Sequence, residues 1–427
     1  MKRKELYGKI VMILALNLII FVSFCGLQIG ALTCPVTITD EGDYYNVVLD
    51  FNSGLTHRQM GIEYARQIKR ANPQYEALVD SYLAEATWLD EIYQLMLQRV
   101  KDIKPQVNPE YWAEIEGMSS QFSGGTNNLR GDGKISQDEF YLFCLVPDLL
   151  RETQCGFCAV WDWNSATRQV MVGRNLDWPG GSENQVGRFQ AIITYKQRHK
   201  TVYSIGYLGF PGIITGFNQY GVFAAIHDSP VGTPYTSKDM NSYTLDLRYA
   251  LENKDSLTGV SNYMKDPSRK YTFNHLIVLA DRKNGQVLEN NFSGCNTAKR
   301  ELRTSASPLN PGVSWWFRNA IAAENSFVLA GNFDNHNLDP RNTARWASYQ
   351  KLLMSKGPII TLEEMKEIMS FDNGNGPGPQ AEGDIYNEET QQSIIFVPET
   401  MRLEIFFHPR VGPRPSDPVY KVIKLVK

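Results

Sequence analysis

The sequence lacks most of the short motifs by which catalytic sites are recognised. It has no G-x-S-x-G nucleophile elbow, no H-E-x-x-H zinc motif, no P-loop, and no G-x-G-x-x-G that opens a helix after a strand. Histidine is scarce, with six in 427 residues, and no two stand at the spacing of metal ligands. These absences argue against serine enzymes of the α/β-hydrolase type, metalloproteases of the H-E-x-x-H type and enzymes that bind nucleotides through a glycine-rich loop.

The sequence also lacks an excess of charge of either sign. It has 43 basic and 46 acidic residues, for a net charge of −3. A nucleic-acid-binding protein usually carries a clustered basic excess, so no nucleic-acid partner is expected. Apolar residues make up 42% of the chain and aromatic residues 11%, which is enough for a sizeable core. The near-neutral charge does not argue against a neutral or lipid-like substrate.

The sequence has a single long hydrophobic run, which lies near the N-terminus. Ile10 to Phe24 is apolar apart from Asn17 and Ser23, and it follows a basic segment with four lysines or arginines. A run of this length suits a signal peptide better than a spanning helix, which needs about 20 residues. We therefore expect residues 1–31 to be a signal peptide for export, to the exterior, the periplasm or a lysosome-like lumen. An N-terminal membrane anchor is the alternative.

Cysteine is sparse too, and its pattern argues against two common uses. Loss of Cys25 with the signal peptide leaves five of six cysteines, so at least one thiol stays unpaired or pairs with another chain. Cys155 and Cys158 form a C-x-x-C, but no second C-x-x-C completes a four-cysteine zinc site. The thioredoxin arrangement needs such a pair at a strand-to-helix turn, whereas the residues after Cys158 have the pattern of a strand.

The order of hydrophobic patterns predicts one α+β domain. Apolar residues recur at helical spacing in residues 55–68 and 77–100. After Cys155 the pattern changes to short strands, beginning with a hairpin whose arms are residues 158–163 and 169–175. Further strands and helices follow, without an evident linker, internal repeat or low-complexity segment.

A glycine- and asparagine-rich loop between the predicted helices has the outline of a calcium-binding EF-hand loop. Asn128, Asp132 and Glu139 stand at ligand positions. Arg130 occupies a position where an oxygen ligand is needed, which argues against calcium. The alternative is a solvated loop before a helix that starts at Ser136, because Ser136-x-x-Glu139 is also a capping box.

The hairpin carries the residues with the clearest chemical use. Its far arm contains Arg174 and Asp177, and pairing of the two arms is expected to fold both back beside Cys158. A cation lowers the pKa of a thiol and favours the reactive thiolate, and a carboxylate can hold an α-amino group. For Arg-x-x-Asp alone, the alternative is a surface ion pair worth about 0–1 kcal/mol.

With these residues the sequence resembles the choloylglycine hydrolase, penicillin V acylase and acid ceramidase group of N-terminal-nucleophile cysteine hydrolases. The group has a cysteine, a hairpin and then G-R-N-x-D before an aromatic residue. Its arginine and aspartate follow the cysteine by sixteen and nineteen residues. Cys158, Arg174 and Asp177 fit this spacing, whereas Cys155 does not. The group also has an asparagine followed thirteen residues later by an arginine, and the matching residues are Asn332 and Arg345.

One position departs from the group. The ceramidase-like members carry an oxyanion-binding asparagine after a strand that follows a glycine, and this chain has His227 at the matching place. A histidine can also donate a hydrogen bond to an oxyanion. The alternative for a lone histidine is a place in the core.

The resemblance implies a four-layer αββα sandwich and a self-processing precursor. Cleavage between Phe157 and Cys158 would separate residues 32–157 from a catalytic chain of residues 158–427. The freed α-amine would act as a base for its own thiol, which attacks an amide carbonyl and forms a thioester. The resemblance implies Cys158, Arg174, Asp177, Asn332 and Arg345 as catalytic residues, and His227 would act as an oxyanion donor. We expect Trp178 and Tyr207 to line the substrate pocket, and the alternative for both is a place in the core.

The expected function is that of an exported amidase, without a cofactor, that hydrolyses a linear amide bond of an N-acyl small molecule. The acyl group is expected to be apolar or lipid-like, so the substrate includes lipids at a membrane surface. The other partners are the two chains of the precursor itself. Two alternatives stay open: an acyltransferase on the same scaffold, in which an amine replaces water, and a non-catalytic exported protein that binds calcium through residues 128–139.

Overall fold

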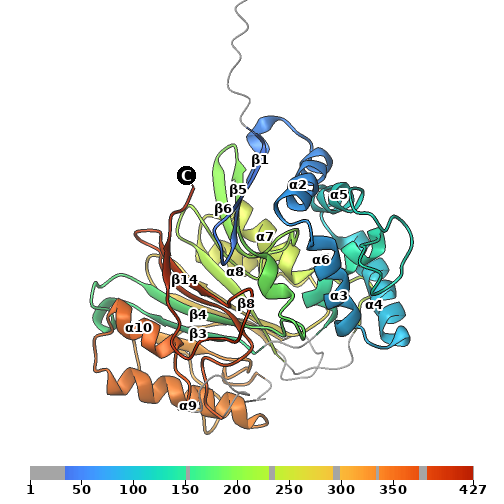
Figure 1. The fold of residues 1–427 in the computed structure, drawn as a ribbon. Helices are drawn as coiled ribbons and strands as arrows, with labels where there is room; N and C mark the ends of the chain where they lie inside the picture. The colour runs from blue at the N-terminus through green and yellow to red at the C-terminus, as the bar shows by residue number, and fades with distance from the viewer. Residues whose placement is uncertain are drawn as a thin grey trace, which may run out of the picture. The chain divides into compact units, whose positions relative to one another are not determined.

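The computed structural model describes residues 34–150, 154–229, 236–291, 299–332, 336–374 and 382–426, and the predicted signal peptide lies outside these ranges. Within them the chain forms helices and two β-sheets (Figure 1), so the predicted α+β class is confirmed. The first sheet has the order β1-β2-β5-β6-β7-β8-β9-β10-β11, and the second has the order β12-β3-β4-β13-β14-β15. Residues 35–427 form one compact unit.

The first sheet is antiparallel except where β2 pairs with β5. Its strands are β1 (Val36–Asp40), β2 (Tyr45–Asp50), β5 (Gln190–Gln197), β6 (Lys200–Tyr207), β7 (Thr215–Asn218), β8 (Phe223–Asp228), β9 (His275–Ala280), β10 (Gly285–Asn290) and β11 (Arg300–Arg303). The second sheet is antiparallel throughout its described pairs. Its strands are β12 (Ala320–Ala323), β3 (Gly156–Val160), β4 (Met171–Asp177), β13 (Thr390–Val397), β14 (Arg402–Phe407) and β15 (Lys421–Ile423).

The bounds of the described α-helices follow the order of the chain. They are α2 (His57–Ala71), α3 (Tyr75–Ala86), α4 (Asp90–Ile103), α5 (Pro109–Ser119), α6 (Gln137–Leu149), α7 (Tyr243–Asn253), α8 (Leu257–Met264), α9 (Pro340–Ser355) and α10 (Leu362–Met369). Among the described residues, no helix combines the length and the apolarity that crossing a membrane requires.

Local sequence explains where the N-terminal helices start and stop. A capping box at Thr56 begins α2, and the helix buries Met60 and Ile68 on one face, as its spacing predicts. The apolar stripe over residues 77–100 is not one helix. It divides between α3 and α4, because the Thr87 hydroxyl bonds the carbonyl of Leu83 and ends α3. The predicted hairpin is confirmed as β3 and β4.

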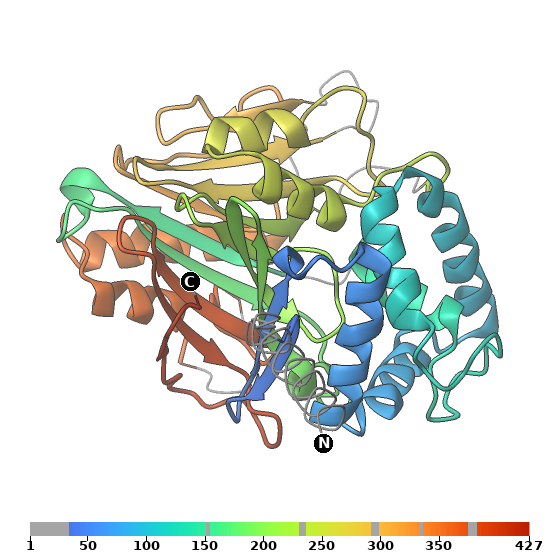
Figure 2. The ribbon, with the colours of Figure 1, turned by 90° about the horizontal axis from the view of Figure 1, so that it is seen from above.

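Three hydrophobic clusters hold these elements together, and they follow the alternation of side chains along each strand. One cluster lies between the sheets and includes Phe157 and Val172 of the second sheet and Ile205 of the first. Another joins the other face of the first sheet to helices α2 to α8. The third joins the other face of the second sheet to α9 and α10, which lie along β3 and β4 (Figures 1 and 2), and it contains Cys158.

Candidate active site

The pairing of β3 with β4 decides which thiol faces Arg174. Phe157 lies opposite Arg174, and Cys158 lies opposite Gly173. Residues directly opposite each other share a face of the sheet, and neighbours along a strand point to opposite faces. Cys158 therefore points away from Arg174, into the cluster against α9 and α10, where burial raises the pKa of its thiol to about 12. The expected juxtaposition of Cys158 with Arg174 is wrong by one residue of register.

The structure instead brings Arg174 to Cys155. One guanidinium nitrogen of Arg174, Nη2, lies 3.4 Å from the Cys155 sulfur and 3.1 Å from the carbonyl oxygen of Ile226. The backbone N–H of Asp177 also donates to this sulfur. Burial raises the pKa of the Cys155 thiol to about 11, while the Arg174 charge and the Asp177 N–H act in the opposite direction. Cys155 is thus a buried thiol with donors already aimed at its sulfur.

Two further side chains hold the backbone of Cys155. Its N–H donates to Oδ1 of Asn325 at 2.8 Å, and its carbonyl accepts from Nη1 of Arg345 at 3.0 Å. Nη2 of Arg345 donates to the same Asn325 oxygen at 3.0 Å, which ties the two residues together. The amide nitrogen of Asn325 donates to the carbonyl of Asp228 at 2.7 Å. The nitrogen and the carbonyl of one cysteine are thereby fixed by side chains from two distant segments.

Asn325 was missed by sequence reasoning, although a signal for it exists. Asn325 follows the apolar strand β12 after one residue, in the polar run Glu324-Asn325-Ser326. Since β12 pairs with β3, polar residues at the end of β12 lie near the start of β3, where Cys155 stands. The thirteen-residue spacing to Arg345 pointed to Asn332 instead.

The structure places Asn332 in another network. Its amide nitrogen donates to Oε2 of the buried Glu289 at 2.9 Å, and its oxygen accepts from Asn291 and from the Lys299 backbone. Glu289 also pairs with Arg303. Asn332 therefore satisfies a buried carboxylate next to β10, and it is not brought to Cys155 with Arg174 and Arg345.

Asp177 joins the group around Cys155. Its carboxylate accepts hydrogen bonds from Asn387 at 2.8 Å and from Thr390 at 2.7 Å. Burial raises the pKa of Asp177 to about 6, and the hydrogen bond from Thr390 and the charges of Arg345 and Arg174 oppose this rise. The carboxyl is therefore ionised at neutral pH and loses its charge as the pH falls through about 6.

His227 reaches the same region from β8. Its Nδ1 lies 3.4 Å from the backbone oxygen of Glu324, the residue before Asn325. Burial, with Arg174 next, holds the pKa of His227 well below its usual range, so the ring is neutral. Its buried Nε2 has no hydrogen-bond partner among the described residues. Because Nδ1 faces a carbonyl oxygen, it carries the single hydrogen of the neutral ring, so Nε2 is an acceptor in this arrangement and would donate to an oxyanion only in the other tautomer.

A small apolar pocket lies next to the residues around Cys155. Trp178 follows Asp177 in the chain, and its indole N–H donates to the Tyr82 hydroxyl at 2.6 Å. Tyr207 lines the same pocket and lies close enough to Arg174 and Cys155 to interact electrostatically with both. The full lining is Tyr82, Phe143, Val146, Pro147, Trp178, Val186, Phe189, Tyr207, Phe210 and Ile214. Trp178 and Tyr207 thus line one apolar pocket together, and a role for it in binding substrate stays a prediction.

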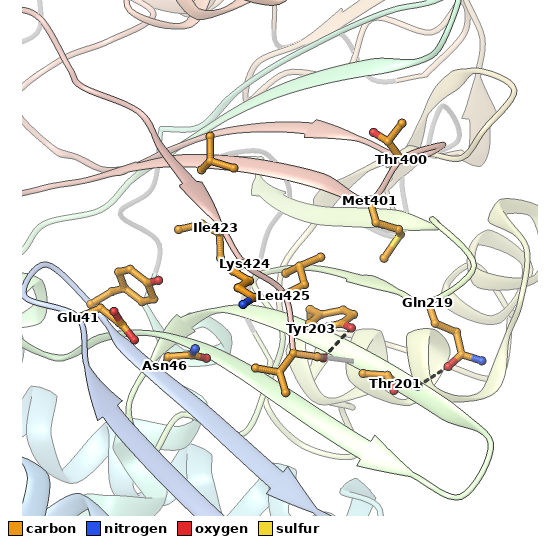
Figure 3. A pocket seen from close by; sticks show the side chains of 13 residues that line it. Glu41, Asn46, Thr201, Tyr203, Gln219, Thr400, Met401, Ile423, Lys424 and Leu425 are labelled. Atoms are coloured by element: carbon orange, nitrogen blue, oxygen red, sulfur yellow. Dashed lines mark hydrogen bonds between the residues drawn. The ribbon is translucent and has the colours of Figure 1, made fainter.

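A second cavity lies at the opposite end of β6 (Figure 3). Thr201 and Tyr203 of β6 line it, together with Asn46 of β2 and the C-terminal residues 422–426. The Tyr203 hydroxyl donates to the carbonyl of Val426 at 3.0 Å. The lining of this cavity contains no cysteine, histidine or arginine among the described residues, so the chemistry is assigned to the Cys155 region.

The C-x-x-C is not a redox pair in this fold. Cys155 directly precedes β3 and faces Arg174, whereas Cys158 faces α9 and α10. Three residues of extended chain span about 10 Å. A disulfide needs Cα atoms within about 7 Å and Cβ atoms that point together. The two thiols are therefore separated in both distance and direction.

The residues of the calcium-like loop are used in other ways. The Glu139 carboxylate accepts from the Ser136 backbone and from the Tyr93 hydroxyl, so the capping-box alternative is confirmed. The Asn128 oxygen accepts from the Ser136 hydroxyl. Arg130 pairs with Asp90. In the part of the chain that the structure describes, no group of three or more His, Cys, Asp or Glu residues is placed to hold a metal ion.

No family model and no curated protein matches the sequence. Several solved structures are similar to the structure of this chain. A Caenorhabditis elegans N-acylethanolamine-hydrolyzing acid amidase ortholog is 17% identical, covers 57% of this chain and 93% of its own, and gives a TM-score of 0.40. A mutant conjugated bile acid hydrolase from Clostridium perfringens is 14% identical, with coverages of 64% and 97% and a TM-score of 0.38.

Penicillin V acylase from Agrobacterium tumefaciens is also similar in structure. It is 10% identical, covers 59% of this chain and 83% of its own, and gives a TM-score of 0.32. By their names, the three similar structures are an acid amidase, a conjugated bile acid hydrolase and a penicillin V acylase.

Proposed function

We propose that this protein is a self-processing cysteine amidase of the N-terminal-nucleophile type and that its nucleophile is Cys155. The observation that carries the proposal is the convergence on Cys155: Arg174 on its sulfur at 3.4 Å and Asn325 on its nitrogen at 2.8 Å. An enzyme of this type needs one residue whose sulfur attacks and whose nitrogen becomes a base. The described contacts hold both atoms of Cys155.

This proposal replaces the cleavage between Phe157 and Cys158 with cleavage between Gln154 and Cys155. Phe157 and Cys158 lie inside β3, which is paired on one side with β4 and on the other with β12. Cutting there would break a strand in the middle of two ladders. Cys155 stands just before β3, so its N-terminal side is not part of a ladder. The catalytic chain would then be residues 155–427.

Self-cleavage follows from attack on the preceding peptide bond. The Cys155 sulfur adds to the carbonyl carbon of Gln154, the bond from that carbon to the Cys155 nitrogen breaks, and the nitrogen takes up the thiol proton. Water then hydrolyses the thioester, which gives a carboxylate on Gln154 and a free thiol and α-amine on Cys155. Asn325 is already placed on the nitrogen that is released.

Amide hydrolysis uses the same atoms again. The new α-amine, with an ordinary pKa near 8, takes the thiol proton, and the sulfur attacks the acyl carbonyl of the substrate. The departing amine takes that proton, and water hydrolyses the acyl thioester. Asn325 supplies an oxyanion donor, and His227 would add a second one in the tautomer that carries its hydrogen on Nε2. Ionised Asp177 stabilises the α-amine, and Arg174 orients the thiol. Arg345 keeps Asn325 in place.

The fold and the substrate class belong to the same proposal. The two facing sheets, with helices on their outer sides, correspond to the four-layer αββα sandwich of such enzymes. The acyl group of an N-acyl small molecule would enter at the apolar lining of Trp178 and Tyr207, where the free volume is about 20 Å³, so the lining side chains would have to move apart to admit it. Residues 1–31 would direct export, with the substrate in solution or at a membrane surface.

The position of the new N-terminus tests the proposal. Purified protein should split into two chains on a reducing denaturing gel, and N-terminal sequencing of the larger chain should begin Cys-Gly-Phe-Cys, at Cys155. A sequence that starts at Cys158 would restore the original choice of nucleophile. A chain that stays intact after prolonged incubation at neutral pH, and that hydrolyses no N-acyl amide, would contradict the whole proposal.

The acyl pocket makes a separate prediction about substrate length. Val146 of α6 lines the pocket, so Val146→Phe should fill part of it. We expect kcat/KM to fall about 10- to 100-fold for long acyl chains and little for acetyl amides, since each lost buried methylene costs about 0.8 kcal/mol. A series of N-acyl amides of increasing length gives the ratio of kcat/KM for long and short acyl chains. This ratio does not depend on the amount of folded enzyme. An equal loss for short and long chains would place the acyl group elsewhere.

A further inference from the structure

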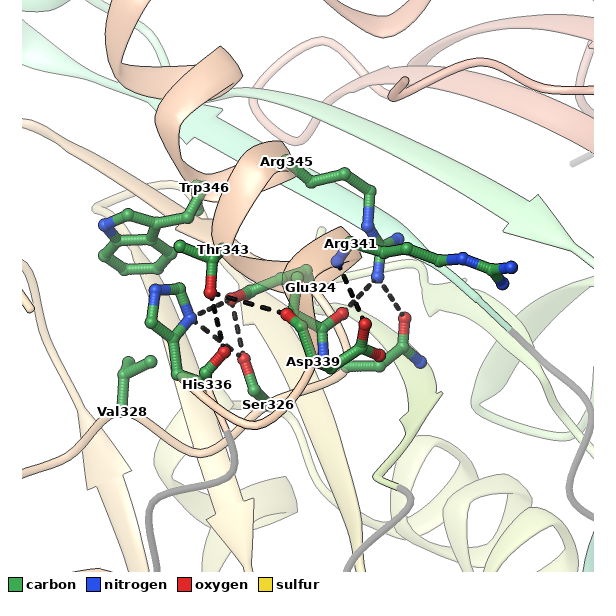
Figure 4. A network of polar contacts seen from close by, with 12 residues as sticks. Glu324, Ser326, Val328, His336, Asp339, Arg341, Thr343, Arg345 and Trp346 are labelled. Atoms are coloured by element: carbon green, nitrogen blue, oxygen red, sulfur yellow. Dashed lines mark hydrogen bonds and ion pairs between the residues drawn. The ribbon is translucent and has the colours of Figure 1, made fainter. Parts of the chain in front are cut away.

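A buried carboxylate and a buried histidine lie directly beside Asn325. Glu324 is 0% exposed, and its Oε1 accepts from Nδ1 of His336 at 2.9 Å and from the Ser326 hydroxyl at 2.6 Å (Figure 4). Because Nδ1 faces a carboxylate oxygen, this nitrogen carries the hydrogen. Nothing in the proposed chemistry uses either residue, yet burying a carboxylate is costly unless it is paired.

The pair connects the two segments that hold Cys155. Glu324 immediately precedes Asn325 at the end of β12. His336 is fastened to the first turns of α9, where its carbonyl accepts from the Thr343 hydroxyl at 2.8 Å and its ring packs edge-on against Trp346 at 5.7 Å. Arg345 lies between Thr343 and Trp346 on that helix. A contact between Glu324 and His336 therefore fixes the Asn325 segment relative to Arg345.

Charge strengthens this connection. Burial raises the pKa of Glu324, but the hydrogen bond and charge of His336, the Ser326 hydroxyl and the charge of Arg345 outweigh it, so the pKa lies below its ordinary value. Oε2 of Glu324 is buried and has no hydrogen-bond partner among the described residues. An ionised carboxylate therefore stands next to the asparagine that contacts Cys155, and it attracts the guanidinium that holds that asparagine.

We propose that Glu324 and His336 are positioning residues that fix Asn325 and Arg345 around Cys155. This inference rests on the proposed function, because it assigns a role to residues that touch the nucleophile. Loss of the pair would leave Cys155 and its thiol chemistry in place, but Asn325 and Arg345 would lose their fixed relation. Misplacement of such groups by about 1 Å can cost about 100-fold in rate.

The test compares three variants of the full chain. Glu324→Gln keeps the shape and removes the charge, His336→Leu removes the donor, and His336→Asn restores an N–H close to the position of Nδ1. We expect Glu324→Gln and His336→Leu to lower kcat for amide hydrolysis about 100-fold with KM unchanged, and to slow self-cleavage equally. His336→Asn should recover most of kcat, which a merely structural loss of the imidazole would not predict.

A matched control separates positioning from stability. Glu114 and Arg248 form another buried ion pair, with Nη1 of Arg248 2.7 Å from Oε2 of Glu114, and their further partners are His57 and Glu252. Glu114→Gln should lower Tm while leaving kcat per self-cleaved chain, counted from the cleaved fraction on a denaturing gel, unchanged. Wild-type kcat in Glu324→Gln and His336→Leu would overturn the positioning role alone. A wild-type chain without self-cleavage or amidase activity would overturn the proposed function as well.

Discussion

Replacing Cys155 by alanine is expected to abolish self-cleavage and amide hydrolysis, whereas replacing Cys158 is expected to leave both nearly intact. Removal of a catalytic nucleophile typically lowers kcat about 10⁶-fold. Cys155 has Arg174 and the Asp177 N–H on its sulfur, while Cys158 lies among apolar side chains of α9 and α10. Cys158→Ala should therefore cost only stability, about 1 kcal/mol from lost packing.

Two measurements distinguish the thiols. A denaturing gel of freshly purified protein shows whether the chain has split, and an N-acyl amide assay shows turnover after processing. Both cysteines are buried, so their accessibility to a thiol reagent in the intact chain does not distinguish them. The two functional assays are therefore needed. A Cys155→Ala chain that splits normally, together with a Cys158→Ala chain that does not, would reverse our assignment.

Replacing Asn325 by aspartate is expected to lower kcat about 100- to 1000-fold, as for loss of one oxyanion donor. An aspartate keeps an oxygen for the Cys155 N–H and for Arg345, but it removes the amide N–H that an oxyanion would accept. The added charge also stands beside a developing negative charge. The KM value should change much less than kcat, because the loss falls on the transition state.

Asn332 supplies the matched control, since it was the asparagine chosen from sequence spacing. Asn332→Ala removes a hydrogen bond to the buried Glu289 carboxylate, which costs about 1–3 kcal/mol of stability. We expect a lower Tm for this variant and an unchanged kcat for the folded enzyme. If Asn332→Ala loses activity at constant stability while Asn325→Asp keeps it, the site that the structure assembles is not the site that reacts.

Several parts of the fold and the site follow from the sequence alone. Helix α2 begins at the capping box of Thr56 and Gln59, and the apolar residues of β3 and β4 predict a hairpin, because these signals are local. Arg174, Asp177 and Arg345 were all named from the sequence, and the structure places all three around one cysteine. Arg174 and Asp177 were named from the hairpin and from the pattern of the group that the sequence resembles, and Arg345 was named from that resemblance alone.

The choice of nucleophile required the tertiary structure. The sixteen-residue spacing between Cys158 and Arg174 includes the turn of the hairpin. The length of a turn does not show which residues of the two strands lie on the same face, so the spacing alone could not identify the cysteine beside Arg174. The pairing register of the two strands decides which side chains lie on each face of the sheet, and a shift of one residue moves every side chain of a strand to the other face. Here Phe157 lies opposite Arg174, so the odd-numbered neighbour Cys155 shares that face and Cys158 does not.

The choice of asparagine has a similar cause. Asn325 and Asn332 differ by seven residues, and both precede Arg345 within a short stretch of sequence. Only the pairing of β12 with β3 brings the end of β12 to Cys155, and that contact joins segments 170 residues apart. The sequence, through its resemblance to a known group, predicted which charged side chains gather around one cysteine. Strand pairing, a long-range property with a period of two residues, decided which thiol and which amide they surround.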